Sequence, residues 1–483
     1  LYDSGRREDI DSLCFLPDIA LSPRTRYWWD VEVWDDAGEA AFSKPAFFET
    51  GKIQEPWTGK WITSDISGNQ NLHKTISVHP TPVSARIYAV GLGLYELYIN
   101  GQKVGDELLA PFCNAYDKWI QVQTYDVTGH FGPADKQYAL KAMLGDGLYK
   151  GRFGFRGDTC LYGNTQTLLL ELHLEYADGT REIIATDETW LASESRVRFA
   201  DIYDGEVYDA TFDDSHVTAC KRYDGINSAT LMDRLSPPVR ITERLAPQTI
   251  FTTPTGETVL DLGQEITGYL EFKTSAPRGT MLKLSYFEIL QDGNYYRDNL
   301  RTAKQEYTYT SDGTETAVRP HFTFYGFRYV KLEGFESPKP DDFTGCVVHS
   351  DIARTAWFAC SSEKVNRLAE NALWGQRGNF LDVPTDCPQR DERMGWTGDA
   401  QAFGGTACFQ MESAAFLSKY MYDIRMEQSK REGSVPHVVP AMGLPGDGSC
   451  AWADAATIIP WTLYLFYGDQ SLLRAQYAAC GVG

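Results

Sequence analysis

The chain has 483 residues with 45 basic and 66 acidic side chains, which gives a formal net charge of −21 at pH 7. This length exceeds what one hydrophobic core normally holds and predicts three or four domains. The negative charge argues against nucleic acid or an anionic membrane as partner and favours a neutral ligand. No apolar run is long enough to span a bilayer. Aromatic residues make up 13% of the chain; most are expected in β-sandwich cores, although aromatic and acidic composition is also common in sugar-binding proteins.

The ten cysteines are scattered along the chain, with no CxxC pair and no histidine at zinc-binding spacing. This pattern predicts free thiols in a reducing compartment rather than a disulfide framework, and it favours a cytoplasmic location. The chain begins at Leu1, without an initiator methionine or a secretory signal. We interpret this start as the interior of a domain whose beginning is missing, so a periplasmic or secreted location stays open.

Residues 1–52 are predicted to form part of a fibronectin-III-like β domain. Residues 27–34 have the alternating pattern of a strand, residues 35–38 supply the Asp and Gly of a turn, and residues 46–50 form a second strand. Two such strands around an Asp/Gly turn are typical of a β-hairpin. We expect this domain to be a spacer.

Residues 57–235 are predicted to form a β-sandwich. Strands at 85–90, 95–102 and 168–176 are punctuated by Asn-Gly and Asp-Gly turns, which is the spacing of an all-β sandwich. A glycine-rich loop at 144–152 contains Asp146. A single carboxylate in such a loop favours a plain turn over a calcium site, and a calcium ion in this domain stays open without being assigned.

Residues 236–352 repeat the β pattern and are predicted to form a second β-sandwich domain. Segments 259–263, 269–272, 281–288 and 322–332 alternate as half-buried strands do. The last of them is rich in aromatic side chains, which we expect to serve the core and an interface.

From about residue 355 the hydrophobic period changes from two to about 3.6 residues, which is typical of helices. Helices are predicted at 361–374, where Ser and Glu occupy capping positions, and at 400–411, 413–427 and 455–466. We therefore predict an all-α domain over residues 355–483. Because so few helices precede residue 483, we expect this to be the first part of a larger helical domain that is truncated.

A charged loop at residues 382–399 separates two of these helices. It holds five carboxylates, two arginines and a tryptophan, and its two prolines and two glycines oppose a regular helix. Unpaired buried charges are costly, so these groups either form a salt-bridge network or line a polar cleft, and spacing alone leaves both interpretations open. Clustered carboxylates beside an aromatic ring suit glycosidic bond cleavage, in which one carboxyl group protonates the leaving oxygen.

Residues 386–401 read DCPQRDERMGWTGDAQ. This segment resembles the signature of bacterial α-L-rhamnosidases, glycoside hydrolase family 78. Segments of the preceding β regions resemble the same family, so that the resemblance extends over nearly the whole chain; they are 100–106, 125–127, 145–149, 204–210 and 322–329.

The resemblance implies both a fold and a reaction. The implied fold is a multidomain protein in which N-terminal β-sandwich domains, the one at 57–235 being carbohydrate-binding-like, precede an all-α (α/α)6 toroid that is catalytic. The implied reaction is the hydrolysis of terminal α-L-rhamnosyl bonds with inversion, and Glu392 matches the general acid. The implied substrate-binding residues are Asp386 and Arg390 for the sugar hydroxyls, Trp396 and Trp452 for the walls of the rhamnose site, and Asp399 for a further contact.

Plainer interpretations of some of these residues are kept beside the functional ones. Trp396 and Trp452 can equally be packing residues, and Asp399 can be a carboxylate stabilised by the N-terminus of a helix. Cys387 is interpreted as structural, and His437 as a packed loop histidine rather than a ligand.

The resemblance places the general base later in the toroid, beyond residue 483, so no base is assigned and this chain is expected to be inactive or barely folded in its last domain. Two other functions stay open: a non-catalytic rhamnose-binding or carbohydrate-binding protein, and an (α/α)6 glycosidase or lyase for another sugar. The expected partner is an L-rhamnose-containing oligosaccharide or glycoside. We expect no nucleic acid, no membrane insertion, no cofactor and no metal at the site, and a homodimer stays open.

Overall fold

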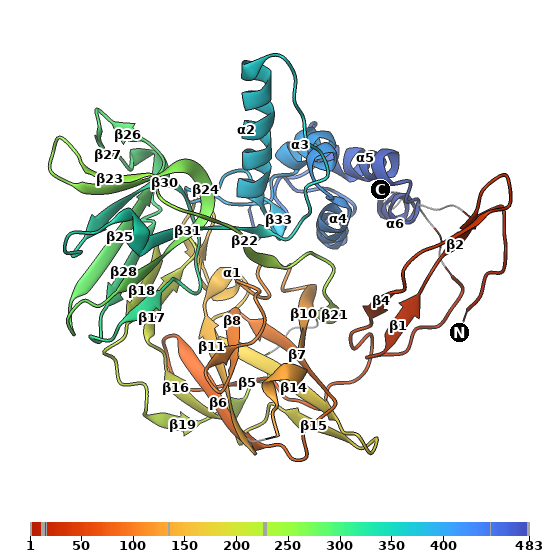
Figure 1. The fold of residues 1–483 in the computed structure, drawn as a ribbon, viewed down its shortest axis with the longest axis horizontal. Coiled ribbons are helices and arrows are strands. Elements are labelled where there is room, and N and C mark those ends of the chain that lie inside the picture. Colours follow the sequence, from red (N-terminus) through yellow and green to blue (C-terminus); the bar gives the residue numbers. More distant parts are fainter. Residues whose placement is uncertain are drawn as a thin grey trace.

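A computed structural model describes residues 2–10, 15, 17–133, 136–225, 229–444 and 446–480. Figure 1 shows strand-rich regions from the N-terminus to the middle of the chain, followed by a group of helices at the C-terminal end. In these ranges no helix combines the length and the apolar composition needed to cross a membrane. Each cysteine in them is a free thiol, as the sequence predicts; Cys14 lies outside the described residues.

The N-terminal region forms two small antiparallel sheets. One pairs β1 (Arg26–Trp29) with β4 (Ala46–Glu49), and the other pairs β2 (Glu32–Trp34) with β3 (Ala40–Phe42). The single strand predicted over residues 27–34 is therefore two strands, because β1 pairs with β4 whereas β2 pairs with β3. The turn at 35–38 does join two paired strands, and the backbone N–H of Gly38 donates to the carbonyl of Asp35 (3.0 Å).

The next region contains two sheets of seven and six strands. Their inner faces contribute to one apolar core that includes Leu72, Leu97, Leu140 and Leu172. The seven-stranded sheet consists of β5 (Ile62–Thr63), β7 (Ser84–Leu92), β10 (Trp119–Asp126), β14 (Thr167–Glu175), β15 (Arg181–Ala185), β20 (Lys221–Arg222) and β21 (Thr230–Asp233). The six-stranded sheet consists of β6 (Gln70–Ser77), β8 (Leu94–Ile99), β9 (Gln102–Lys103), β11 (Gln137–Gly145), β16 (Leu191–Glu194) and β19 (Val217–Ala219).

A ten-stranded sheet follows, and it recruits a hairpin from the preceding region. β17 (Val197–Asp201) and β18 (Gly205–Asp209) precede the predicted boundary at 235, yet β18 pairs in parallel with β28 (Glu306–Thr310). Gly205 allows this approach, since a Cβ atom there would lie 1.8 Å from the carbonyl oxygen of Glu306. The remaining strands are β22 (Val239–Leu245), β23 (Thr249–Thr252), β24 (Thr258–Thr274), β25 (Met281–Phe287), β29 (Thr316–Val318), β30 (Tyr325–Glu333) and β31 (Phe343–Ser350).

Short elements connect these sheets. They are α1 (Gly147–Lys150), the 3-10 turns at Thr128–His130, Asp298–Leu300 and Pro340–Asp342, and three two-stranded pairs: β12 (Arg152–Phe153) with β13 (Asp158–Thr159), β26 (Leu290–Gln291) with β27 (Asn294–Tyr295), and β32 (Phe380–Leu381) with β33 (Val383–Pro384).

The C-terminal region is helical, as the sequence predicts. Its helices are α2 (Glu363–Asn379), α3 (Thr397–Gln410), α4 (Ala414–Gln428), α5 (Ala455–Tyr467) and α6 (Ser471–Cys480). The first four correspond to the predicted ranges, and α6 was not predicted. Gly468 ends α5 in the left-handed conformation (φ 70°), a common way to terminate a helix.

A buried ionic cluster joins the helices to the first large β region. The Lys419 ammonium on α4 lies 3.2 Å from a carboxylate oxygen of Asp382 and 3.0 Å from one of Asp423. Asp382 also accepts the backbone N–H of Cys113 (3.0 Å), and Asp423 accepts the indole N–H of Trp119 (2.8 Å). Because Asp382 opens the charged loop, this cluster fixes where the loop begins relative to both regions.

Candidate active site

The charged loop leaves β33 and enters α3 at Thr397, and its two ends are tied together. The backbone N–H of Asp386 donates to the carbonyl of Met394 (3.1 Å), and the Met394 N–H donates back to the Asp386 carboxylate (3.1 Å). Gly395 lies against residues 435–439, where a Cβ atom would come within 2.3 Å of the Val439 carbonyl. Only glycine fits at this position without displacing the backbone.

Arg393 anchors the loop on the ten-stranded sheet. Its guanidinium donates to the carbonyls of Ile202 and Phe324 (both 2.7 Å) and to the side chain of Gln305 (3.1 Å). It also lies over the rings of Tyr203 and Phe324. Burial without a carboxylate partner lowers the pKa of Arg393 to about 10. The sequence makes Arg393 a salt-bridge candidate, whereas the structure gives it backbone carbonyls.

Glu392 is 8% exposed and lies between two guanidinium groups. Arg390 of the same loop approaches it to 3.1 Å, and Arg301, which follows a 3-10 turn of the β region, forms an ion pair with the same carboxylate oxygen. The hydroxyl of Tyr203 donates to the Glu392 backbone carbonyl (2.7 Å). The position of this carboxyl group is therefore set by two separate regions of the chain.

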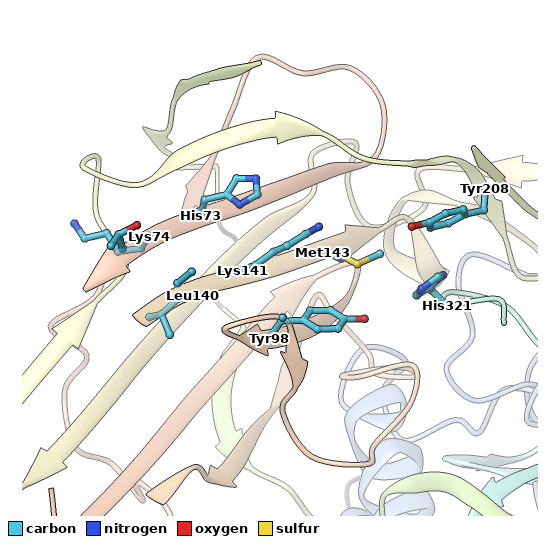
Figure 2. A pocket seen from close by; sticks show the side chains of 11 residues that line it. His73, Lys74, Tyr98, Leu140, Lys141, Met143, Tyr208 and His321 are labelled. Carbon is cyan, nitrogen blue, oxygen red and sulfur yellow. The ribbon is translucent and has the colours of Figure 1, made fainter. Parts of the chain in front are cut away.

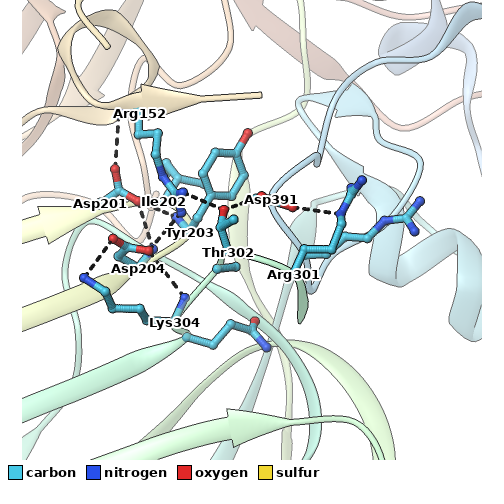
Figure 3. A network of polar contacts seen from close by, with 12 residues as sticks. Arg152, Asp201, Ile202, Tyr203, Asp204, Arg301, Thr302, Lys304 and Asp391 are labelled. Carbon is cyan, nitrogen blue, oxygen red and sulfur yellow. Dashed lines mark hydrogen bonds and ion pairs between the residues drawn. The ribbon is translucent and has the colours of Figure 1, made fainter. Parts of the chain in front are cut away.

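Asp391 points to the β region and is part of a polar network (Figure 3). Arg301 Nε lies 2.8 Å from its carboxylate, and the Thr302 hydroxyl donates to the other carboxylate oxygen. Thr302 accepts a hydrogen bond from Arg152 (2.8 Å), which pairs with Asp204 (2.8 Å). Asp391 is thus paired within the protein, and the same Arg301 contacts both acids of the Asp-Glu pair.

Asp386 and Arg390, both predicted substrate-binding residues, meet beside Glu392. Arg390 lies 3.6 Å from the Asp386 carboxylate and donates to the Cys387 sulfur (3.3 Å). Burial raises the pKa of Asp386, and the negative charge of Glu392 adds to this shift. Ligand atoms of Asp386, Cys387 and Glu392 lie within 4.8 Å of one another, which is close enough for a metal ion. The Arg390 guanidinium already supplies the positive charge there, so the donor set favours an arginine-bridged acid pair.

A second acid pair lies next to the loop and was not predicted. Burial raises the pKa of Glu265 to about 9, with a further contribution from the charge of Glu288. Glu288 accepts a hydrogen bond from Asn299 (2.6 Å), and its own pKa is raised mainly by burial; Gln389 of the loop also hydrogen-bonds to it. Glu288 directly follows β25, where an alternating pattern gives no sign that the charge will be buried.

Three aromatic side chains form a row that begins in the charged loop, at Trp396. The Trp396 ring is nearly parallel to the His437 ring (centroids 6.5 Å apart, 20°), and His437 lies 5.6 Å from Trp452. Trp452 covers Gly398, where a Cβ atom would lie 2.9 Å from the indole nitrogen. The structure therefore links the two predicted tryptophans through His437, which the sequence analysis interprets only as a packed loop histidine. Asp399 lies at the start of α3, and its side chain is largely exposed. Its carboxyl group is nevertheless partly buried, and this burial raises its pKa, with a further contribution from the negative charge of Glu392.

The loop around Asp146 has protein partners of its own. The Asp146 carboxylate lies 2.9 Å from the Lys150 ammonium and accepts a hydrogen bond from Gln166 (2.7 Å). The segment contains one helical turn, α1, where the sequence favours a plain turn, and the Asp146 carboxylate is already paired. A calcium ion in this domain stays unassigned.

Four family models match successive parts of the chain. They are the Rha78A-like N-terminal immunoglobulin domain (residues 1–54), the α-L-rhamnosidase N-terminal domain (81–243), the bacterial α-L-rhamnosidase concanavalin-like domain (251–349) and the bacterial α-L-rhamnosidase 6 hairpin glycosidase domain (353–481). The chain belongs to the bacterial α-L-rhamnosidase family. The family model describes an immunoglobulin domain where the sequence predicts a fibronectin-III-like fold; both are β-sandwich architectures.

Individual α-L-rhamnosidases agree with this assignment. The chain is 39% identical over 458 residues to one from Streptomyces avermitilis, covering 92% of this chain and 44% of the relative. The crystal structure of the native enzyme from Aspergillus terreus superposes with a TM-score of 0.91 at 34% identity, covering 96% of this chain and 56% of that one. A Streptomyces avermitilis enzyme complexed with L-rhamnose superposes with a TM-score of 0.88 at 29% identity, covering 96% and 63%. The chain thus spans about half the length of the curated relatives it matches.

Proposed function

We propose that this protein hydrolyses terminal α-L-rhamnosyl bonds in a rhamnose-containing oligosaccharide or glycoside, with Glu392 as the general acid. The observation that carries the proposal is the placement of Glu392: a nearly buried carboxyl group, held by Arg301 and Arg390, beside Asp386, in a loop that also supplies Trp396. Family membership supports the same substrate, since a relative is described in complex with L-rhamnose.

Glu392 would give its proton to the glycosidic oxygen as the bond from that oxygen to the sugar carbon breaks. General acid catalysis of this kind is worth about 10²–10⁴ in rate. Inversion requires a second carboxylate, about 6.5–9.5 Å from the acid, to take a proton from the attacking water. The family resemblance assigns that base to a later part of the (α/α)6 toroid, which is proposed here as the architecture of the whole catalytic domain.

Two polar atoms of the charged loop are suited to hold the sugar. Among the described residues, the second carboxylate oxygen of Asp386 and the indole N–H of Trp396 are buried without a hydrogen-bond partner. Buried polar atoms are normally satisfied, so a ligand hydroxyl that accepts from Trp396 or donates to Asp386 would complete them. The apolar 6-methyl group of rhamnose would pack on the row formed by Trp396, His437 and Trp452.

The proposal is tested with 4-nitrophenyl α-L-rhamnopyranoside. We expect a form of the protein that includes the later part of the toroid, where the base is assigned, to release nitrophenol, with β-L-rhamnose as the first anomer seen by proton NMR. Release of nitrophenol from another 4-nitrophenyl glycoside, but not from the rhamnoside, would contradict the substrate. If α-L-rhamnose appeared first, the reaction would proceed with retention. Glu412→Gln, an exposed acid in the same helical region, is the matched control for substitutions of Glu392.

A further inference from the structure

A groove of about 440 Å³ lies where the six-stranded sheet meets the ten-stranded sheet. Its volume is in the range typical of small-molecule sites. One wall comes from strands β6, β8 and β11, and the other carries Tyr208 and His321 (Figure 2). No residue of the charged loop at 382–399 lines it. The groove is therefore separate from the proposed active site.

The first wall carries a row of three side chains across neighbouring strands. Lys141 on β11 lies directly opposite His73 on β6 and opposite Tyr98 on β8. Directly opposed residues of antiparallel strands project from the same face of a sheet. The row therefore presents an imidazole, an ammonium and a phenol side by side, and Figure 2 shows Tyr98 and Lys141 directed to the end of the groove where Tyr208 and His321 lie.

The second wall is an ordered aromatic stack. The Tyr208 ring stacks on His321 (centroids 5.4 Å apart, 18°) and on Tyr309 (5.9 Å, 19°). Glu206 fixes His321, because its carboxylate accepts the backbone N–H (2.8 Å) and lies 2.9 Å from ring Nδ1. Stacked rings of this kind offer flat apolar faces, against which the C–H face of a sugar ring can pack.

The cations that line the groove have carboxylates behind them, but the two lysines are held only loosely. The Lys74 ammonium lies 3.7 Å from Asp187, whereas Glu206 holds His321 closely and Glu96 accepts the Tyr98 hydroxyl. The nearest carboxylate to the Lys141 ammonium is Asp214 at 4.0 Å, which also lies 3.2 Å from Arg196. Burial lowers the pKa of Lys141, which indicates that this ammonium is desolvated more than it is neutralised.

We propose that this groove binds an acidic saccharide, with a uronate carboxylate on the Lys141 ammonium and a sugar ring against Tyr98 or Tyr208. Asp214 divides its negative charge between Lys141 and Arg196, so an anionic ligand would give the Lys141 ammonium a partner of its own. Charge-assisted contacts of this kind are strong where water is excluded. The choice of a saccharide rather than another anion rests on the proposed function, since a rhamnose-containing oligosaccharide can also carry acidic sugars.

The test is calorimetric titration of the protein with trigalacturonate and with its fully methyl-esterified, uncharged counterpart. Trigalacturonate should bind at least tenfold more tightly than the ester. Lys141→Met keeps the apolar stem but removes the charge, and it should weaken trigalacturonate binding at least tenfold. Lys44→Met, which removes an exposed charge in the N-terminal region, is the matched control and should leave binding unchanged. Tyr208→Leu removes one platform and should weaken both saccharides.

Three outcomes would overturn the proposal: equal affinity for acid and ester, unchanged affinity in both Lys141→Met and Tyr208→Leu, or tighter Lys141-dependent binding of a single-stranded RNA than of trigalacturonate. Circular dichroism of each variant shows whether it is folded, and the two substitutions on different sheets keep the test decisive if one of them fails to fold. Hydrolysis of 4-nitrophenyl α-L-rhamnopyranoside is measured in parallel. If the unsubstituted protein does not hydrolyse this rhamnoside, the result counts against the proposed function alone, because trigalacturonate binding does not depend on hydrolysis.

Discussion

Replacing Lys419 by methionine should destabilise the protein by about 3–5 kcal/mol, since removing one partner of a buried ion pair leaves an uncompensated charge. The side chain is fully buried, and its ammonium lies 3.2 Å from the Asp382 carboxylate, 3.0 Å from the Asp423 carboxylate and 2.6 Å from the Cys113 carbonyl. Asp382 keeps the hydroxyl of Ser236 and the backbone N–H of Cys113 as donors. Asp423 keeps only the indole N–H of Trp119 among the described residues, so Asp423 carries most of the cost.

The pH dependence of this loss has a defined sign. Burial raises the pKa of Asp423 to about 6 even with Lys419 present, and removal of the cation raises it further. A carboxyl group whose pKa is higher in the folded state favours folding at low pH, and this advantage disappears as the pH rises through the folded value. The difference in stability between Lys419→Met and the unsubstituted protein should therefore be smaller at pH 5 than at pH 8.

Urea denaturation followed by circular dichroism measures this loss. Lys364→Met on the exposed face of α2 is the control and should change the free energy of unfolding by no more than about 0.5 kcal/mol. Adding Asp423→Asn to Lys419→Met should restore part of the stability, because it removes the unpaired charge. A loss below about 1 kcal/mol, or no recovery in the double variant, would refute this reasoning about the cluster.

Three further predictions concern other buried or cross-region contacts. Burial lowers the pKa of His349 from 6.5 to about 4, so the unfolded chain takes up a proton at a higher pH than the folded protein does. The free energy of unfolding should therefore fall by up to about 3 kcal/mol as the pH drops from 6.5 to 4. His349→Gln should flatten the dependence of melting temperature on pH, and an unchanged slope would contradict this prediction. Arg301→Gln should lower kcat on a rhamnoside at least tenfold by releasing Glu392, whereas Lys304→Gln should not, and equal kcat values would exclude a positioning role for Arg301. His437→Ala should raise KM about threefold to tenfold by loosening the aromatic row, with His216→Ala as an exposed control; a change in kcat alone would argue against this role.

The sequence predicts the parts of this structure that depend on local patterns. The helical period identifies α2 to α5, and the prolines and glycines of residues 382–399 identify the loop between them. The pairing of the strands is harder to predict from the sequence. β18 pairs with β28, which lies about 100 residues later, and no local pattern identifies that partner. This long-range pairing is why the boundary predicted at residue 235 cuts through the ten-stranded sheet.

The candidate site divides in the same way. The signature loop identifies Glu392, Asp386 and Arg390, which the structure brings together. Arg301 was missed because its approach to the loop depends on a 3-10 turn that leaves it in the left-handed region (φ 57°, ψ −115°), a conformation that costs an arginine about 1–3 kcal/mol. Glu265 and Glu288 were missed because only the packing of the loop on the β region shows that their charges are buried.

The role of Glu392 is tested most directly by Glu392→Gln on two rhamnosides that differ in leaving group. An alkyl rhamnoside needs protonation of the departing oxygen, so the rate should fall about 10²–10⁴-fold. A dinitrophenyl rhamnoside needs little protonation, so its rate should stay within about tenfold of the unsubstituted protein, while Glu412→Gln should leave both rates unchanged. Equal losses on the two substrates would contradict the account: Glu392 would then bind the sugar or support the loop, and the acid would have to be sought at Asp391 or Asp399.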